Sequence, residues 1–224
     1  AAEAAAYLRA LRSILRYTEV SDADMEKGQF RCDANVSLRL RGESRLGTRT
    51  EIKNLNSFAH VEAAITAEIQ RQSELLDDGL AVVQATLAWD PERGRTRVLR
   101  LKENADDYRY FDDPDLIPLV ISEERIESVR RTLPELPEQK KLRFQQDYAL
   151  SLRDAGVLTS SRSLADFFER AARASDTPRS VANWVVRDLL RELKERDVEV
   201  DALAITPEAL ASLVEVVDLL QSEP

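Results

Sequence analysis

The chain has 224 residues, a mass of 25.3 kDa and a formal net charge of −9 at neutral pH. It is 43% hydrophobic and 33% charged, which provides enough apolar material for a core and too much charge for a membrane protein. The single cysteine, Cys32, excludes an intrachain disulfide framework, and the single histidine, His60, disfavours a Ser-His triad or a histidine-rich metal site. The acidic balance argues against a protein that wraps nucleic acid over its whole surface, but it leaves room for a local basic patch.

Helix and strand patterns alternate in the first half of the chain. The expected elements are a helix over 3–17, strands over 30–40 and 48–55, a helix with Ser57 as N-cap and Gly79 as its stop, and a hairpin of 81–89 and 95–101. The order lacks the regular βαβ rhythm of a Rossmann fold. We therefore predict an α+β domain with antiparallel strands.

The strand pattern ends after Pro118. Amphipathic stretches then begin at Ser122, Pro137, Ser161, Pro178 and Thr206-Pro207, which predicts five helices. The acidic segment 112–118 carries two prolines and is the expected junction. The sequence therefore predicts two domains, an α+β domain over 1–118 and an all-α domain over 119–224.

Three polar stretches exceed ordinary surface composition. In the first, over 31–37, Asp33 and Asn35 lie two residues apart on the expected strand and project to the same side. A carboxylate and an amide in this arrangement can hold a hard cation or orient a polar substrate. A solvated strand face with cross-strand ion pairs would produce the same pattern.

The second stretch, over 48–57, leads directly into a helix. The free N–H groups of a helix N-terminus favour anions, so Lys53, Asn56 and Ser57 are candidates for contact with a phosphate. Simple capping of the helix by Asn56 or Ser57 is the alternative and needs no ligand.

The third stretch, over 93–102, contains five cations and no acid. These are Arg93, Arg95, Arg97, Arg100 and Lys102. A compact basic hairpin is suited to nucleic-acid phosphates, and it can equally serve to prevent strands from pairing with other molecules.

Several motifs resemble the GatB family, the B subunits of glutamine-dependent aspartyl/glutamyl-tRNA amidotransferases. The matching segments are RCDANVS at 31–37, TRTEIKNLNSF at 48–58, DYRYFDDPDL at 107–116, LTSSRSLADFFE at 158–169 and ANWVVRDLL at 182–190. They cover nearly the whole chain in the order of the family. The resemblance implies the second part of a glutamine-synthetase-like cradle domain followed by a helical domain. It also implies a fragment, with the first half of the cradle before residue 1 and a tail domain after residue 224.

The resemblance implies a carbon-nitrogen ligase that works as a heterotrimer with amidotransferase subunits A and C. The A-type partner would release ammonia from glutamine. The B-type chain would use ATP and Mg²⁺ to activate the side-chain carboxylate of misacylated Asp-tRNA(Asn) or Glu-tRNA(Gln), which is then amidated. The expected location is the cytoplasm, or an organelle in a eukaryote, with no membrane partner. This fragment alone is expected to be inactive.

Carried over by position, Asp33 and Glu51 become the metal-proximal carboxylates, with Lys53 as a third catalytic residue. Asn35, Lys53, Asn56 and Ser57 become candidates for nucleotide binding, and the five cations of 93–102 for tRNA binding. A plain hairpin closed by 42–47 would leave Asp33 roughly 20 Å from Glu51 along the ladder. For both to reach one metal ion, the strands must pair differently.

A different class of function fits the same sequence. The chain could act only in tRNA docking and subunit scaffolding, with the chemistry supplied elsewhere. Dependence on magnesium at Asp33 distinguishes the two, because a scaffold has no need of a metal there.

Overall fold

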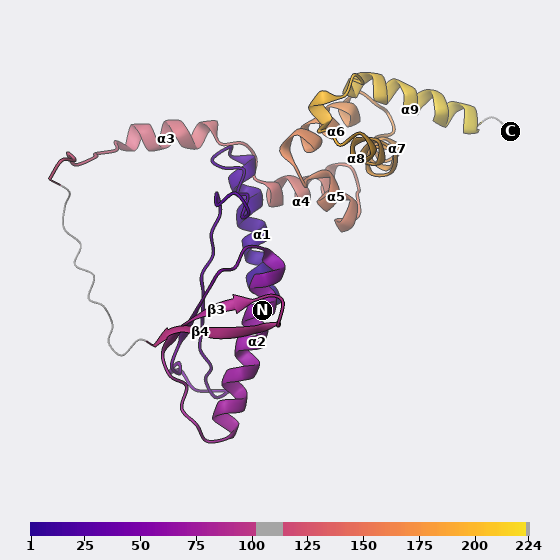
Figure 1. Cartoon of the computed structure of the whole chain (residues 1–224). Helices are drawn as coiled ribbons and strands as arrows, with labels where there is room; N and C mark the ends of the chain where they lie inside the picture. The colour runs from indigo at the N-terminus through magenta and orange to yellow at the C-terminus, as the bar shows by residue number, and fades with distance from the viewer. Residues whose placement is uncertain (102–113, 223–224) are drawn as a thin grey trace. The chain divides into compact units, whose positions relative to one another are not determined.

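The computed structural model describes residues 1–101 and 114–222 and divides into two compact units (Figure 1). Unit 1 comprises Ala1–Arg12 and Asp22–Arg131, and unit 2 comprises Ser13–Ser21 and Thr132–Pro224. Helix α1 (Ala2–Tyr17) therefore contributes its first turns to unit 1 and its last turn to unit 2. Each unit has its own cluster of buried apolar side chains.

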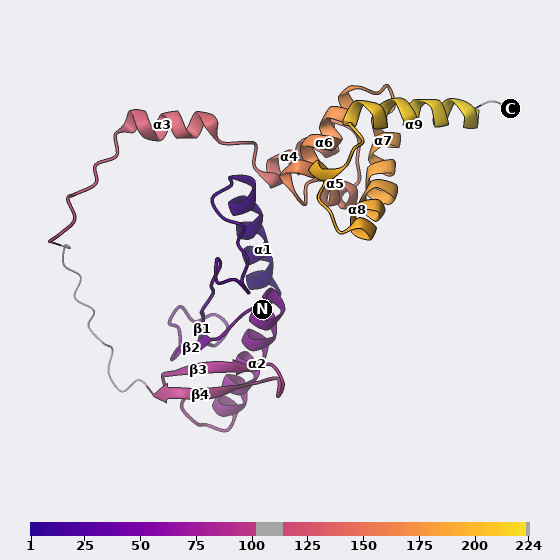
Figure 2. The same ribbon diagram turned by 45° about the horizontal axis from the view of Figure 1, so that its top comes forward.

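Unit 1 contains a four-stranded sheet in the order β1-β2-β3-β4 (Figure 2). The strands are β1 (Ala34–Val36), β2 (Thr50–Lys53), β3 (Ala85–Asp90) and β4 (Arg95–Leu101). The outer pairs are antiparallel and β2 runs parallel to β3. Helix α2 (Phe58–Asp77) lies between β2 and β3 in the chain and supplies the long crossover that a parallel pair requires. The α+β class is confirmed, but the expectation of antiparallel strands is wrong for one pair, because the crossover through α2 makes β2 and β3 parallel.

The two strands predicted before α2 are shorter than expected. Of 30–40 only Ala34–Val36 is strand, and of 48–55 only Thr50–Lys53. Within β1 the predicted side-chain orientation is confirmed, because Ala34 and Val36 are buried. Beyond the end of β1, Leu40 was predicted to share their face but is exposed. The predicted cap of α2 is confirmed, because the Ser57 hydroxyl accepts a hydrogen bond from the His60 N–H at 3.1 Å.

A buried carboxylate anchors α2 to the sheet. Glu68 accepts hydrogen bonds from the Thr50 hydroxyl at 2.7 Å, from the Gln72 amide at 2.9 Å and from the Arg71 guanidinium at 2.6 and 2.9 Å. The Thr96 hydroxyl adds a longer bond of 3.3 Å. Burial alone would raise the pKa of Glu68, but these bonds outweigh it and hold that pKa below its ordinary value. Glu68 is therefore buried as a satisfied anion.

Helices make up unit 2. They are α4 (Pro137–Asp147), α5 (Leu152–Leu158), α6 (Arg162–Arg173), α7 (Pro178–Trp184), α8 (Leu190–Arg196) and α9 (Pro207–Ser222), with a π turn over Val185–Leu189 and a 3-10 turn over Val200–Ala202. Helix α3 (Glu123–Thr132) precedes them. The starts predicted at Ser122, Pro137, Ser161, Pro178 and Pro207 are confirmed. Helix α5, with 7 residues, was not predicted. Among the described residues, no helix is both long and apolar enough to cross a membrane.

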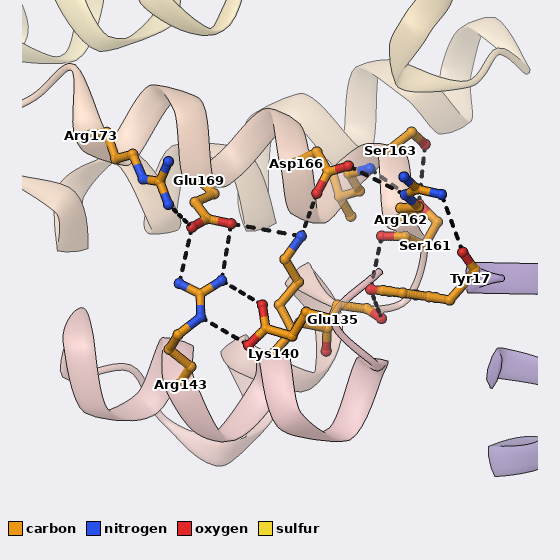
Figure 3. Close-up of polar contacts among 12 residues, drawn as sticks. Tyr17, Glu135, Lys140, Arg143, Ser161, Arg162, Ser163, Asp166, Glu169 and Arg173 are labelled. Atoms are coloured by element: carbon orange, nitrogen blue, oxygen red, sulfur yellow. Dashed lines mark hydrogen bonds and ion pairs between the residues drawn. The ribbon is translucent and has the colours of Figure 1, made fainter. Parts of the chain in front are cut away.

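An ionic cluster joins α4 to α6 in unit 2 (Figure 3). Glu169 of α6 accepts hydrogen bonds from Arg143 at 3.0 and 3.1 Å and from Arg173, and its carboxylate lies 3.7 Å from the Lys140 ammonium. Lys140 also pairs with Asp166. Burial opposes the charge of Glu169, yet Arg143 and its other cations bring its pKa below the ordinary value. The cluster therefore fixes the packing of the two helices.

Candidate functional site

The two faces of the sheet in unit 1 differ in character. Alternate residues along β1, β2 and β3 face α2 and form the core, including Ala34, Val36, Ile52 and Leu87, although Ala85–Trp89 of β3 is buried throughout. The residues between them face the opposite side, which we call the polar face. The register Asn35↔Glu51↔Thr86 and the bond from the Thr86 hydroxyl to Glu51 at 3.1 Å place these three in one row across it.

Asp33, Glu51 and Lys53 come together on the polar face. The Lys53 ammonium lies 2.9 Å from Asp33 Oδ2 and 3.4 Å from Glu51 Oε1. The hydrogen bond to Asp33, together with Coulombic attraction to both carboxylates, raises the pKa of Lys53. The side chains are 48%, 21% and 40% exposed for Asp33, Glu51 and Lys53, so the cluster is open to solvent.

This geometry removes the separation expected for a plain hairpin. The strands pair with Asn35 opposite Glu51, so that Asp33 is next to the row of Glu51 and beside Lys53. Residues 37–49 form a long connection between β1 and β2 in place of the expected closure over 42–47. The strands pair differently, as joint metal binding would require.

The arrangement fits a hard cation. Two carboxylates point toward one position, and the Lys53 ammonium shows that a positive charge is stable there. Mg²⁺ commonly binds one or two protein carboxylates and completes its shell with water and substrate phosphates. In the described part of the chain, no group of three or more His, Cys, Asp or Glu side chains could hold a metal ion by itself. Asp33 and Glu51 would therefore supply only part of a magnesium shell.

The other candidates for nucleotide binding have different surroundings. Asn35 is exposed on the polar face directly opposite Glu51. Ser57 uses its hydroxyl as the N-cap of α2, so the capping interpretation is correct for this residue. Asn56 is exposed and its amide donates to Asn54 Oδ1 at 3.5 Å.

Three of the arginines also belong to the polar face. Arg97 is paired with Ala88 and Arg95 with Asp90, so both share the face of Thr86 two and four residues along β3. A bulge in β4 then pairs Arg100 with Thr86 and Val98 with Leu87. Odd and even positions of a strand normally face opposite sides of the sheet. Because of the bulge, the even-numbered Arg100 lies on the same face as the odd-numbered Arg95 and Arg97.

The remaining cations lie off this face or outside the described residues. Arg93 is exposed in the turn between β3 and β4, where its backbone N–H donates to Asp90 Oδ1 at 3.2 Å. Lys102 and residues 107–113 of the DYRYFDDPDL motif lie outside the described residues. Of the basic stretch, Arg95, Arg97 and Arg100 thus share one surface with Asp33 and Glu51, whereas Arg93 does not.

Sequence reasoning missed Thr86, which orients Glu51 from β3. Thr86 lies 35 residues from Glu51 in the chain, and only the parallel register of β2 and β3 brings the two together. No local pattern signals such a register, because it depends on how α2 packs.

Comparisons with known proteins agree with this architecture. The family model for the GatB/GatE catalytic domain matches residues 1–127, and a second GatB domain model matches residues 166–219. The B subunit of the aspartyl/glutamyl-tRNA(Asn/Gln) amidotransferase from Oleidesulfovibrio alaskensis is 52% identical over 214 residues, which are 96% of this chain and 45% of that protein. The proteins of the same name from Desulfotalea psychrophila and Chlorobium limicola are 56% and 48% identical over 85% and 95% of this chain, and over 40% and 45% of their own length.

The chain thus spans less than half the length of these curated relatives. The catalytic-domain model nevertheless matches more than half of this chain, and the second model matches its helical part. The chain therefore belongs to the GatB family.

Proposed function

We propose that the chain is the carboxyl-activating part of the B subunit of an ATP-dependent aspartyl/glutamyl-tRNA amidotransferase. In this function the enzyme transfers the γ-phosphoryl group of ATP to the side-chain carboxylate of Asp-tRNA(Asn) or Glu-tRNA(Gln), with release of ADP. Ammonia from glutamine then displaces phosphate and forms the amide. The amidotransferase subunits A and C are the proposed partners, and the cytoplasm is the proposed location.

The observation that carries the proposal is the convergence of Asp33 and Glu51 beside Lys53 on a face that also bears arginines. In phosphoryl transfer the protein mainly positions the reactants and stabilises charge. When bound, Mg²⁺ would neutralise the phosphate oxygens. Asp33 and Glu51 would hold that ion, and Lys53 would turn from them to a phosphate oxygen.

The other candidate residues complete this division of roles. Asn35, Asn56 and Ser57 would contribute polar contacts to the nucleotide, in the case of Ser57 from the capped start of α2. Arg95, Arg97 and Arg100 would meet tRNA phosphates at the β4 side of the polar face, with Arg93 and Lys102 extending the contact. The division into a cradle domain over 1–118 and a helical domain over 119–224 belongs to the same proposal.

The test is Asp33→Asn in the assembled heterotrimer. The substitution keeps the shape of the side chain and removes the charge that a magnesium ion needs. We expect tRNA-dependent ATP cleavage to fall by about 100-fold or more, as when one electrostatic contact to a transition state is removed. Glutamine hydrolysis should persist, and added magnesium should restore part of the rate. Paired assays of ATP and glutamine hydrolysis measure both effects.

A matched control is Asp77→Asn, which removes the same charge from an exposed position at the end of α2. This variant should retain full ATP cleavage. Wild-type ATP cleavage in Asp33→Asn would instead favour the docking and scaffolding function. Equal loss of both activities, together with altered circular dichroism, would indicate misfolding, and the magnesium dependence of Glu51→Gln would then decide.

A further inference from the structure

The two carboxylates of the polar face differ in how much support they need. Asp33 has the shorter side chain, which is 48% exposed, whereas the longer side chain of Glu51 is 21% exposed. A long, unbranched side chain loses much rotamer freedom when it is fixed in one orientation. Glu51 therefore depends more than Asp33 on a neighbour that holds its carboxylate in place.

The two oxygens of Glu51 have different neighbours. The Thr86 hydroxyl donates a hydrogen bond to Oε2 at 3.1 Å, and the Lys53 ammonium lies 3.4 Å from Oε1. The same ammonium lies 2.9 Å from Asp33 Oδ2. A carboxylate that is held at Oε2 by Thr86 therefore presents Oε1 at the position that it shares with Asp33.

Thr86 is a rigid donor. It lies on β3, inside the sheet, and pairs with Glu51 of β2 on one side and with Arg100 of β4 on the other. The register of β4 shifts at this pair, and such bulges often aim a side chain next to a functional site. Threonine is β-branched, which restricts its χ1 angle, and only 2% of Thr86 is exposed. The direction of its hydroxyl is thus fixed, and bulk water has little access to the bond.

The sheet contains a second contact of the same kind on its other face. The Thr50 hydroxyl donates to the carboxylate of Glu68 at 2.7 Å. Glu68 is fully buried and also accepts hydrogen bonds from Arg71 and Gln72, so this contact serves the packing of α2. Glu51 is partly exposed, and the contact with Thr86 holds a carboxylate that solvent can reach. The two threonines therefore make the same bond in two settings.

We infer that Thr86 is a positioning residue whose hydroxyl fixes Glu51 Oε2, so that Oε1 and the Asp33 carboxylate are directed at one divalent cation. The inference rests on the proposed function, which assigns Mg²⁺ to these carboxylates. Thr86 does not contact the ion and acts only through Glu51. Loss of a polar partner that holds a metal ligand commonly weakens metal binding about 10- to 100-fold. A threonine that only ties β3 to β2 would leave metal affinity unchanged.

The experiment measures the binding of Mn²⁺ to the 224-residue chain by electron paramagnetic resonance of the free ion. Thr86→Val keeps the branched shape and removes the hydroxyl, and it should weaken Mn²⁺ binding about 10-fold. Thr86→Ser keeps the hydroxyl and should retain most of the affinity. Thr50→Val is the matched control, because it removes a buried hydroxyl from the face of the sheet that packs on α2. It should lower stability to urea and leave Mn²⁺ affinity unchanged.

A double-mutant cycle tests whether Thr86 acts through Glu51. In the Glu51→Gln background, Thr86→Val should cause no further loss of Mn²⁺ affinity, because the carboxylate that the hydroxyl holds is already absent. Equal weakening in both backgrounds would overturn the inference, as would equal weakening by Thr86→Ser and Thr86→Val. If circular dichroism shows that Thr86→Val does not fold, Thr86→Ser and Thr86→Ala provide the same comparison, since they differ by the hydroxyl alone.

The remaining outcomes separate this inference from the proposed reaction. Absence of Mn²⁺ binding to the wild-type chain would overturn the role of Thr86. If Thr86→Val binds Mn²⁺ normally while Asp33→Asn abolishes ATP cleavage, the role of Thr86 is wrong and the proposed function stands. If Thr86→Val loses Mn²⁺ affinity while Asp33→Asn cleaves ATP normally, Thr86 positions a metal ligand and the assigned reaction is wrong.

Discussion

Each unit of the chain contains a cluster of carboxylates and cations, and the two clusters differ in exposure and charge balance. In unit 2, Glu169 is 11% exposed and contacts Arg143, Arg173 and Lys140. In unit 1, Asp33 and Glu51 share the Lys53 ammonium, and Asp33 is 48% exposed. A buried acid with several cations is satisfied by its own fold, whereas two partly exposed acids beside one ammonium are the carboxylates to which the proposed function assigns a further cation. Exposure and charge balance therefore distinguish the cluster of unit 2, which stabilises helix packing, from the cluster of unit 1, which is the candidate site.

The largest expected effect on stability lies in unit 2. Glu169→Ala removes the acid that Lys140 and Arg143 share and leaves buried positive charge less compensated. Losing one partner of a buried pair costs about 3 kcal/mol. Denaturation of the chain with urea, followed by circular dichroism, measures the loss. Asp33→Asn should change stability by less than about 0.5 kcal/mol, because exposed pairs contribute little. Equal effects of the two variants would contradict the distinction between the clusters.

The arginines of β4 provide the next test. Arg95 and Arg97 share the polar face with Asp33 and Glu51, so changing both to Glu should repel nucleic acid from the site. We expect tRNA binding by the assembled enzyme to weaken about 10- to 100-fold. The slope of the logarithm of the binding constant against the logarithm of the salt concentration should become shallower by about two, one for each phosphate contact that is lost. Filter binding at several salt concentrations measures both quantities. Arg130→Glu, on exposed α3, is the control for a change of charge alone. Unchanged affinity and slope would show that Arg95 and Arg97 do not bind tRNA and would favour the alternative role, in which they prevent the edge strand from pairing with other molecules.

The stability of unit 1 should depend on pH through Glu68. Its pKa is lowered in the folded state, so its contribution is complete above its ordinary pKa of 4.5 and is lost as pH falls through the lower folded value. Glu68→Gln removes this titration and weakens the charged hydrogen bond to Arg71. We expect a loss of about 1–2 kcal/mol at pH 7 and a smaller further loss below pH 4.5 than in the wild type. Urea denaturation between pH 3 and 7 would contradict the role of Glu68 if both proteins lost stability in parallel.

The sequence predicts those parts of the fold that depend on neighbouring residues. The Ser57 cap and the start of α6 at Ser161 were predictable because a hydroxyl at an N-cap acts within three residues. The register that brings Asp33 to Lys53 was not predictable, because residues 37–49 form a long connection whose course depends on Gly47 approaching Leu38. The alternation over 30–40 suggested a longer strand, but β1 ends at Val36.

The candidate site shows the same limit. Motifs singled out Asp33, Glu51 and Lys53, but their mutual distances depend on pairing between β1 and β2. The common face of Arg95, Arg97 and Arg100 depends on a bulge, which strict alternation excludes. The side chains of the site were thus accessible from sequence, and their arrangement required the sheet.

The smallest expected effect concerns Lys53 and addresses the comparison most directly. If Asp33 and Glu51 form a metal site, the Lys53 ammonium competes with the metal for their oxygens. Lys53→Met removes this competitor and keeps most of the length and apolar stem of the side chain. We therefore expect Mn²⁺, a spectroscopic substitute for Mg²⁺, to bind the chain about five-fold more tightly, equivalent to about 1 kcal/mol.

Electron paramagnetic resonance of free Mn²⁺ measures this affinity without any enzymatic assay. Lys27→Met is a suitable control, because Lys27 pairs with the exposed Asp24 away from the sheet. In the double variant Lys53→Met, Asp33→Asn the gain should disappear, since one of the two carboxylates is then lost. Weaker Mn²⁺ binding in Lys53→Met than in the wild type would mean that the lysine holds the carboxylates in place. The cluster of unit 1 would then be a structural ion pair like that of unit 2, and the distinction drawn from exposure and charge balance would fail.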